Sequence, residues 1–180
     1  MRNGRPKVVW NTRTIVILGL MMAITIILTR YLSIQVGGWF RLSLGSVATM
    51  LTGMWFGPVA GFIAGAASDV IGLMIAPTGG WLPLITLSAG LWGVIPALTT
   101  GLIRGSRTRR IVVICLIVTG TSVICQLILT SIALVTLYGT GIMPSRLVQF
   151  ACSTPVYCIL VNLLYASPVT KMVFTEVVKA

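Results

Sequence analysis

The sequence predicts an all-α integral membrane protein, folded as one compact bundle of six transmembrane helices with both termini in the cytoplasm. Composition is the first support for this prediction: hydrophobic residues make up 57% of the chain, charged residues only 8%, and the mean hydropathy is +1.04. Soluble domains carry about 25% charged residues, so this chain could not maintain a soluble surface. Its length of 180 residues suits a single domain, 1–180.

Apolar runs divide the chain into six spans. A transmembrane helix needs about 20 apolar residues, and the run from Leu42 to Ala76 is too long for one crossing. Gly57-Pro58 splits it, because proline is favoured in the first turn of a helix and disfavoured inside one. The predicted spans are 14–32, 42–56, 58–75, 82–103, 111–138 and 146–169.

The distribution of lysine and arginine supports six spans and sets their orientation. Cytoplasmic loops are enriched in these residues. With six spans, ten cations fall on one side, whereas merging the second and third spans would place the 104–110 loop outside. The ten are Arg2, Arg5, Lys7, Arg13, Arg104, Arg107, Arg109, Arg110, Lys171 and Lys179.

Three arginines break this pattern, because Arg30, Arg41 and Arg146 fall at the outer ends of the first, second and sixth spans. One explanation is that their side chains extend to the outer lipid headgroups. The other is that they bind an anionic ligand, since the sequence predicts no carboxylate outside to pair with them.

Asp69 is one of only two acidic residues, and it lies inside the third span. A carboxylate at such a depth costs about 2.5–3.5 kcal/mol and is rare without a partner. Gly57, Gly61, Gly65 and Asp69 are spaced by four, so they share one helix face, and glycines on it allow another backbone to approach. We therefore expect this face to point into the bundle. Asp69 could form a buried ion pair with an outer arginine, or it could bind a ligand.

Other candidate residues are amides and aromatics in the outer half, namely Gln126, Gln149, Trp92, Tyr31 and Trp39. Each alone is also explained by helix packing or by an aromatic belt. Trp39 lies in the polar stretch 33–41 with two glycines, which suits a mobile lid. Taken together, a carboxylate, arginines, amides and aromatics suit a flat heterocycle with anionic groups, because carboxylates and guanidinium groups make paired hydrogen bonds. Pterins and folates have both features.

Several other chemistries are disfavoured. The chain has no histidine, and its four cysteines have spacings unlike zinc or redox motifs, so we expect no metal site. A proton relay uses several acidic residues or histidines in series, and a hydrolase needs a nucleophile and a base. Because Asp69 is the one candidate base, we expect no enzyme. The charge of +11 does not indicate nucleic-acid binding, because the cations separate apolar runs.

The segment FGPVAGFIAGAASDVIG, residues 56–72, with six spans and a basic N-terminus, resembles the S components of energy-coupling factor (ECF) vitamin transporters, and most closely the folate-specific members. The resemblance implies a high-affinity folate-binding subunit in a prokaryotic cytoplasmic membrane. It also implies docking on a shared module of one transmembrane coupling protein and two cytosolic ATPases. No Walker A motif occurs in the chain, so ATP would be hydrolysed by the partners and no cofactor is expected here.

This resemblance suggests roles for the candidate residues. Asp69 would bind the pterin edge, and the three outer arginines would bind the glutamate carboxylates. Trp92, Tyr31 or Trp39 would pack on the rings, while Gln126 and Gln149 would supply amide hydrogen bonds. Gly19 and Ala23 match the small-residue pair with which S components contact the coupling protein. The alternatives are an S component for another vitamin and a structural membrane subunit without a ligand.

Overall fold

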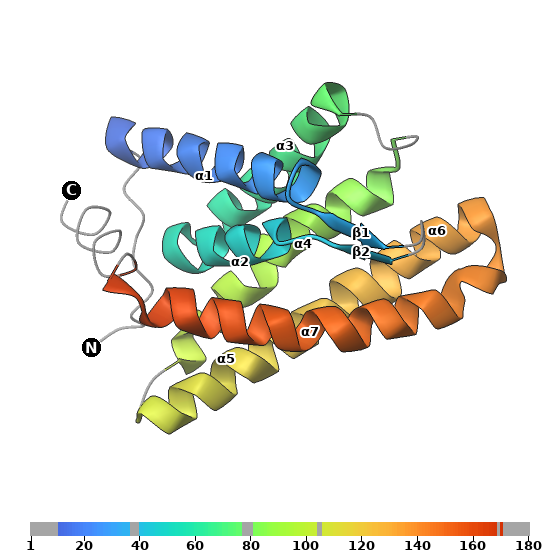
Figure 1. Ribbon diagram of the computed structural model, residues 1–180. Coiled ribbons are helices and arrows are strands. Elements are labelled where there is room, and N and C mark those ends of the chain that lie inside the picture. The colour runs from blue at the N-terminus through green and yellow to red at the C-terminus, as the bar shows by residue number, and fades with distance from the viewer. Residues whose placement is uncertain (1–10, 37–39, 77–80, 104–105, 169, 171–180) are drawn as a thin grey trace.

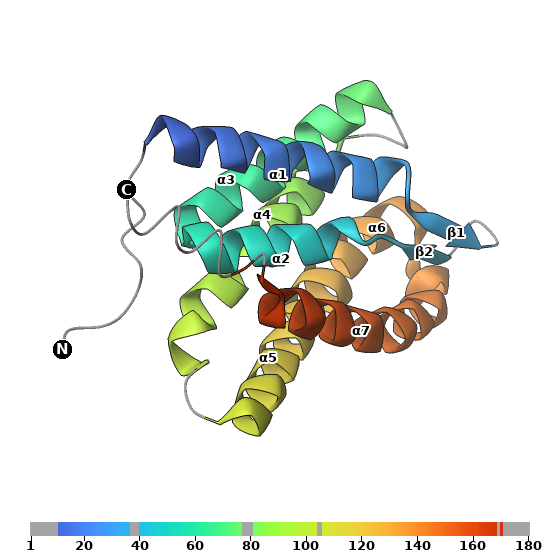
Figure 2. The same ribbon diagram turned by 60° about the vertical axis from the view of Figure 1, so that its left-hand side comes forward.

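The computed structural model describes residues 11–36, 40–76, 81–103, 106–168 and 170. Within these ranges the chain is a helical bundle with one short pair of strands (Figures 1 and 2). The elements are α1 (Thr12–Arg30), β1 (Ile34–Val36), β2 (Phe40–Leu42), α2 (Gly45–Phe56), α3 (Pro58–Ile75), α4 (Pro83–Thr99), η1 (Thr100–Leu102), α5 (Arg107–Ser122), η2 (Val123–Leu129), α6 (Thr130–Tyr138), η3 (Thr140–Ile142) and α7 (Met143–Ala166).

The bundle confirms the predicted fold class. Since α5, η2 and α6 follow one another without a break, the described helices form six segments, and five of these are long and apolar enough to cross a membrane. The sixth segment is α2, which has 12 residues and a length of about 18 Å. Both chain termini lie outside the described residues, so their predicted cytoplasmic location stays a prediction.

The short helix α2 occupies the centre of the bundle. It contacts α1, α3, α4 and α7, and every one of its residues except Ser46 is buried. Figures 1 and 2 show it enclosed between α1 on one side and α7 on the other. A helix that is apolar on all sides belongs in the interior. Because protein rather than lipid surrounds α2, the segment need not match the thickness of the bilayer.

Gly57 separates α2 from α3 as the sequence predicts. Its φ of 89° is a conformation that glycine adopts without strain, and Pro58 then begins α3. Proline in the first helical turn loses no hydrogen bond, since that N–H has no intrahelical partner. The two residues therefore end one helix and start the next without an intervening loop.

The stretch between α1 and α2 differs from the prediction of a loop followed by a helix from Leu42. Ile34–Val36 and Phe40–Leu42 form an antiparallel pair in which Gln35 faces Arg41, and α2 begins only at Gly45. The sequence IQVGGWFRL contains the signal for this arrangement, since two alternating segments flank a glycine pair, which favours a tight turn. Because Leu42 is apolar, the sequence pattern assigns it to the start of the second span rather than to a strand.

A second difference lies in the predicted 111–138 span, where residues Val123–Leu129 form a π-helix. The wider π turn alters the backbone hydrogen bonding, and two side chains respond. The hydroxyl of Thr130 donates to the carbonyl of Cys125 at 2.8 Å, and that of Ser131 donates to the carbonyl of Gln126 at 3.3 Å. π-Helical turns are rare in proteins, and those that occur are often found at functional sites. The residues of η2 are therefore candidates for a binding site.

Three glycines bring the backbones of α2, α3 and α4 into contact. Gly53, Gly61 and Gly93 are all buried. A Cβ atom added to Gly93 would lie 2.5 Å from the carbonyl oxygen of Gly61, and one added to Gly61 would lie 2.8 Å from the Cα of Gly53. Residues without a side chain allow such close approach, which strengthens van der Waals packing between membrane helices. We call this contact the glycine crossing.

We predict that Gly93→Ala destabilises the protein by about 1–3 kcal/mol, because the added methyl group overlaps the backbone of α3. Thermal unfolding of the purified protein in detergent measures the effect. Gly120→Ala is the matched control, because a Cβ atom at Gly120 meets no other atom within 4 Å. An unchanged melting temperature for Gly93→Ala would contradict the glycine crossing.

Candidate functional site

Most of the predicted binding residues lie toward one end of the bundle. This end carries the C-terminal end of α1, the two strands, and the N-terminal ends of α4 and α7, and we call it the β-hairpin end (Figure 1). The opposite end carries Arg13, Arg109 and Arg110, at the starts of α1 and α5, and we call it the arginine end. The positive-inside rule assigns the arginine end to the cytoplasm.

Asp69 and Arg30 form an ion pair between α3 and α1. The guanidinium Nη2 of Arg30 lies 3.7 Å from Oδ1 of Asp69, and the two side chains are 4% and 14% exposed. The same guanidinium donates to the backbone carbonyls of Ala76 at 3.3 Å and Asp69 at 3.4 Å. Gly72 leaves the space for it, since a Cβ atom there would lie 2.8 Å from Nε of Arg30. Asp69 therefore has the arginine partner that a buried carboxylate requires.

The other carboxylate oxygen of Asp69 is bound from α4. The hydroxyl of Thr86 donates to Oδ2 at 2.9 Å, and the indole Nε1 of Trp81 donates to that hydroxyl oxygen at 3.1 Å. An ionised carboxylate offers about four acceptor positions, so these contacts leave capacity for further donors. Thr86 carries no sequence signal of this role, because threonine is common in membrane helices and its partner is distant in the sequence.

A second polar group lies between η2 and α7. Along α7, Gln149, Ser153 and Tyr157 are buried at intervals of four residues, so they form one inward stripe. Arg146 is half-buried at the head of this stripe, and its Nη1 donates to Oε1 of Gln149 at 2.9 Å. We call these four residues, with Gln126 of η2, the polar seam.

Gln126 places an amide inside the polar seam. Its Oε1 accepts a hydrogen bond from the hydroxyl of Ser153 at 3.2 Å, while its Nε2 is buried and donates to none of the described residues. A buried donor without an acceptor costs roughly 1–3 kcal/mol. The geometry thus presents an amide N–H that an acceptor atom of a ligand could bind.

An aromatic pair closes the inner end of the polar seam. Trp92 of α4 and Tyr157 meet edge to face, with ring centroids 5.8 Å apart at an angle of 89°. The hydroxyl of Tyr157 also donates to the carbonyl of Ser43, just after β2, at 3.0 Å. Ser153 and Tyr157 are absent from the sequence-based candidates, although their spacing of four and eight residues from Gln149 could have identified them.

The ion pair and the polar seam contact different faces of α4. Thr86 points to Asp69, whereas Ser88 donates to the carbonyl of Cys125 in η2 at 2.9 Å. Two positions along a helix correspond to a turn of about 200°, so these side chains point in nearly opposite directions. The structure therefore places Arg146, Gln149 and Gln126 in the polar seam, whose inner end contacts Trp92 through Tyr157, and it places Arg30 and Asp69 in a separate pair.

The remaining predicted residues are not brought into either group. Tyr31 is 69% exposed. Arg41 takes part in β2 through its backbone, its side chain is not described, and Trp39 lies outside the described residues. Gly19 and Ala23 are exposed on the outer face of α1, where a Cβ atom at Gly19 would meet nothing within 4 Å.

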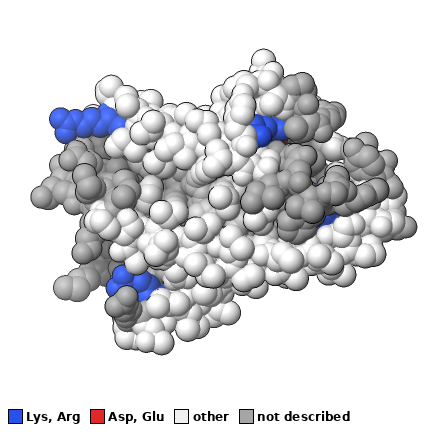
Figure 3. Space-filling view, in the orientation of Figure 1, with Lys and Arg blue, Asp and Glu red and all other residues white. Residues whose placement is uncertain are grey.

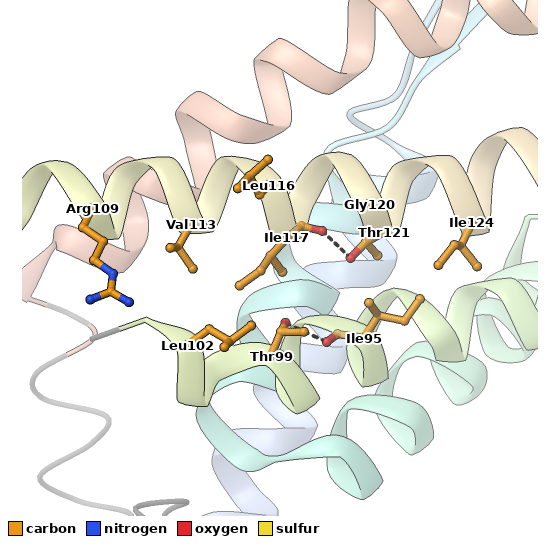
Figure 4. Close-up of a pocket in the computed structure, with 10 residues that line it drawn as sticks. All are labelled: Ile95, Thr99, Leu102, Arg109, Val113, Leu116, Ile117, Gly120, Thr121 and Ile124. Atoms are coloured by element: carbon orange, nitrogen blue, oxygen red, sulfur yellow. Dashed lines mark hydrogen bonds between the residues drawn. The ribbon is translucent and has the colours of Figure 1, made fainter. Parts of the chain in front are cut away.

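A cavity of about 360 Å³ lies elsewhere, between α4 and α5, with Arg109 at one end (Figure 4). Its lining contains none of the predicted binding residues. The lining residues are Ile95, Thr99, Leu102, Arg109, Val113, Leu116, Ile117, Gly120, Thr121 and Ile124. This cavity is apolar apart from one arginine and two threonines, so it does not match a heterocycle with several hydrogen-bonding groups.

Comparisons with known proteins agree with this architecture. A family model described as "ECF-type riboflavin transporter, S component" matches residues 9–174. The folate transporter FolT of Clostridium novyi (strain NT) is 39% identical over 85 residues, which are 47% of this chain and 49% of that protein. The match thus spans about half the length of this curated relative.

Two solved structures share the fold. A crystal structure of FolT bound with folic acid superimposes with a TM-score of 0.73 and 25% identity, over 86% of this chain and 93% of that one. The structure of the S component of a bacterial ECF transporter gives a TM-score of 0.57 and 19% identity, over 84% of this chain and 95% of that one.

The apolar helices, the buried polar groups and the shared fold define a multi-pass membrane protein of the transporter class. With the family match covering nearly the whole chain, it belongs to the family of ECF-type transporter S components whose model is described for riboflavin. Members of this family are components of transporters, and the resemblance to ECF S components inferred from residues 56–72 is confirmed.

We predict that Asp69→Asn destabilises the protein, because it leaves the Arg30 guanidinium buried without its counter-charge. Breaking a fully buried pair costs about 3–5 kcal/mol, and the 14% exposure of Asp69 places the expected loss at the lower end. Thr86→Val is the control, because it removes only a neutral donor to the same carboxylate; a hydrogen bond to a charged group contributes about 1.5–3 kcal/mol, so this loss should be the smaller of the two. Thermal unfolding in detergent measures both variants.

The double variant Arg30→Gln/Asp69→Asn completes the test. It should be more stable than the sum of the two single losses indicates, because neither charge is then left alone. Strictly additive losses would show that the two side chains do not interact in the folded protein.

Proposed function

We propose that this protein is the high-affinity folate-binding S component of an ECF-type importer. The observation that carries the proposal is that FolT is matched by sequence and by structure, and that the matched structure contains folic acid. The family model is described for riboflavin instead. We favour folate because the relative and the solved structure are individual proteins with that ligand, whereas a family model describes many sequences.

The polar seam has the chemistry that folate requires. Folate carries a pterin ring with hydrogen-bond donors and acceptors at one end and glutamate carboxylates at the other. In our proposal Arg146 binds a carboxylate, which arginine does with paired charge-assisted hydrogen bonds. Gln126 and Gln149 supply amide hydrogen bonds, and Trp92 packs on a ring.

In our proposal the Arg30–Asp69 ion pair forms one side of the folate site, and the polar seam forms the other side. Asp69 retains acceptor positions beyond those used by Arg30 and Thr86, so it would accept hydrogen bonds from the pterin edge. Because folate is elongated, one molecule could contact Asp69 and the polar seam across the N-terminal end of α4. Arg30, Arg41, Tyr31 and Trp39 remain proposed contacts from the segment between α1 and α2.

The partners in this proposal are a transmembrane coupling protein and two cytosolic ATPases, which supply the energy for import. ATP can drive import only if its binding to the module favours the docked state of the subunit, in which the ligand faces inward. The exposed pair Gly19 and Ala23 on α1 suits docking, since small residues four apart allow a partner helix to approach closely. Binding from the outside is consistent with the location of the polar seam toward the β-hairpin end.

Titration of the purified protein with folate tests the proposed ligand, with tryptophan fluorescence as the signal. We expect saturable quenching at or below roughly micromolar folate. Riboflavin, thiamine and biotin should not displace the bound folate. Displacement by riboflavin at equal concentration would assign the site to the ligand of the family description. No saturable binding of any of the four would favour a structural subunit.

The residue test within this titration is Arg146→Gln, which should weaken folate binding at least about tenfold, equivalent to about 1.4 kcal/mol. The control is Arg13→Gln, which removes the same charge at the arginine end and should leave the affinity within about twofold. Equal affinities of the two variants would exclude Arg146 from the site.

For the proposed docking, we predict that Ala23→Trp reduces co-purification of the chain with its coupling protein and ATPases by at least about fivefold, since the indole blocks helix approach. Folate binding should be unchanged. Leu163→Trp is the control, because Leu163 is 66% exposed on α7 and lies on another face. Equal recovery of the module with both variants would contradict docking through α1.

A further inference from the structure

The cavity between α4 and α5 is a groove that follows α5 over most of its length. Its lining on α5 extends from Arg109 to Thr121, which corresponds to about 18 Å of helix, and Ile124 of η2 continues it. One leaflet of a bilayer contributes about half of a hydrocarbon thickness of roughly 30 Å. The groove therefore has the length to accommodate an acyl chain from a lipid in one leaflet.

The groove opens outward between exposed apolar side chains. Leu102 is 61% exposed, Leu116 is 67% exposed and Ile124 is 41% exposed. In Figure 4, Val113 and Ile117 extend from α5 toward α4, with Ile95, Thr99 and Leu102 on the other side. Gly120 adds a notch to the wall, since no atom lies within 4 Å of where its Cβ would be.

The threonines of the groove do not make it polar. The hydroxyl of Thr99 donates to the carbonyl of Ile95 at 2.9 Å, and that of Thr121 donates to the carbonyl of Ile117 at 2.7 Å. With both hydroxyl protons used within their own helices, the groove presents methyl groups and hydrocarbon side chains. Along the length of α5 the groove is therefore suited to a hydrocarbon ligand.

Arg109 is the charged residue at one end of this lining. Figure 4 shows its guanidinium extending from the first turn of α5 toward the side of α4, at the end of the row of apolar residues. Three more arginines, 104, 107 and 110, belong to the same seven-residue segment, and neither of the two acidic residues of the chain belongs to it. Clusters of arginine at a membrane surface attract anionic lipid headgroups.

We infer that this groove binds an anionic phospholipid, with one acyl chain along α5 and its phosphate at Arg109. The groove has the length and the apolar walls for an acyl chain, and the one cation of its lining, Arg109, lies at the arginine end, where the phosphate of the headgroup would be. The face shown in Figure 3 is mostly uncharged among the described residues, with Arg at a few separate places. The inference does not depend on folate being the transported ligand.

Native mass spectrometry of the full chain, purified in detergent, tests this inference. The protein is titrated with palmitoyl-oleoyl phosphatidylglycerol and, separately, with phosphatidylcholine that has the same acyl chains. We expect one tightly retained phosphatidylglycerol, bound at least about fivefold more tightly than phosphatidylcholine. Equal retention of the two lipids by the unmodified protein would overturn the inference.

Two pairs of variants locate the lipid. Arg109→Gln should abolish the preference for phosphatidylglycerol, whereas Arg110→Gln removes the same charge one residue later and should retain it within about twofold. Arg110 is not among the residues that line the groove. Gly120→Phe should weaken both lipids at least about fivefold by filling the notch, and Ile159→Phe, at a 68% exposed position on α7, should weaken neither.

Other outcomes identify a different occupant and would overturn the inference. Equal effects of Arg109→Gln and Arg110→Gln would indicate nonspecific attraction to the whole loop. A dimer that disappears in Gly120→Phe would assign the groove to a second copy of the chain. Loss of the coupling module in Gly120→Phe, with lipid binding intact, would assign it to a protein partner. The melting temperature and the helical circular dichroism of each variant report that the bundle is folded.

Discussion

The structure depends on the close contact of three backbones at Gly53, Gly61 and Gly93. Membrane helices gain little from hydrophobic burial against one another, because lipid tails are equally apolar, so tight van der Waals packing has to hold them together. The glycine crossing fixes α3 and α4 against α2. Asp69 follows Gly61 by eight residues, or about 12 Å of helix, and so meets Thr86 of α4 and Arg30 of α1.

Most hydroxyl groups in the bundle are satisfied within their own helices. Donation to a carbonyl four residues earlier occurs at Thr25, Thr49, Thr52, Thr121 and Ser122. The proton of such a hydroxyl is already donated within its own helix, so the hydroxyl needs no partner on a neighbouring helix. The polar side chains that do reach across helices are consequently informative. Among the described residues they gather at the Asp69 ion pair and the polar seam, with smaller contacts between Ser88 of α4 and η2 and between cysteine and asparagine side chains of α5 and α7.

Sequence patterns predicted the features that depend on composition and local spacing. The apolar runs, the turn at Gly57-Pro58 and the alternatives for Asp69 follow from solvation and backbone rules, and Arg30 proves to be the partner of that carboxylate. The strands were missed because apolar Leu42 was assigned to the following span, and the π-helix was missed because a π turn has no residue signature. Thr86 and the separation of Asp69 from the polar seam depend on how α4 is rotated, which only tertiary packing determines.

The enclosed position of α2 also affects how the protein responds to its solvent. A helix exposed to lipid has to match the hydrocarbon thickness, and a mismatch is relieved by tilting or by deforming the bilayer. With α2 screened by its neighbours, that adjustment falls on the five longer segments, four of which contact it. Membranes of different thickness would change the inclination of the outer helices, while the central helix and its glycine contacts keep their geometry.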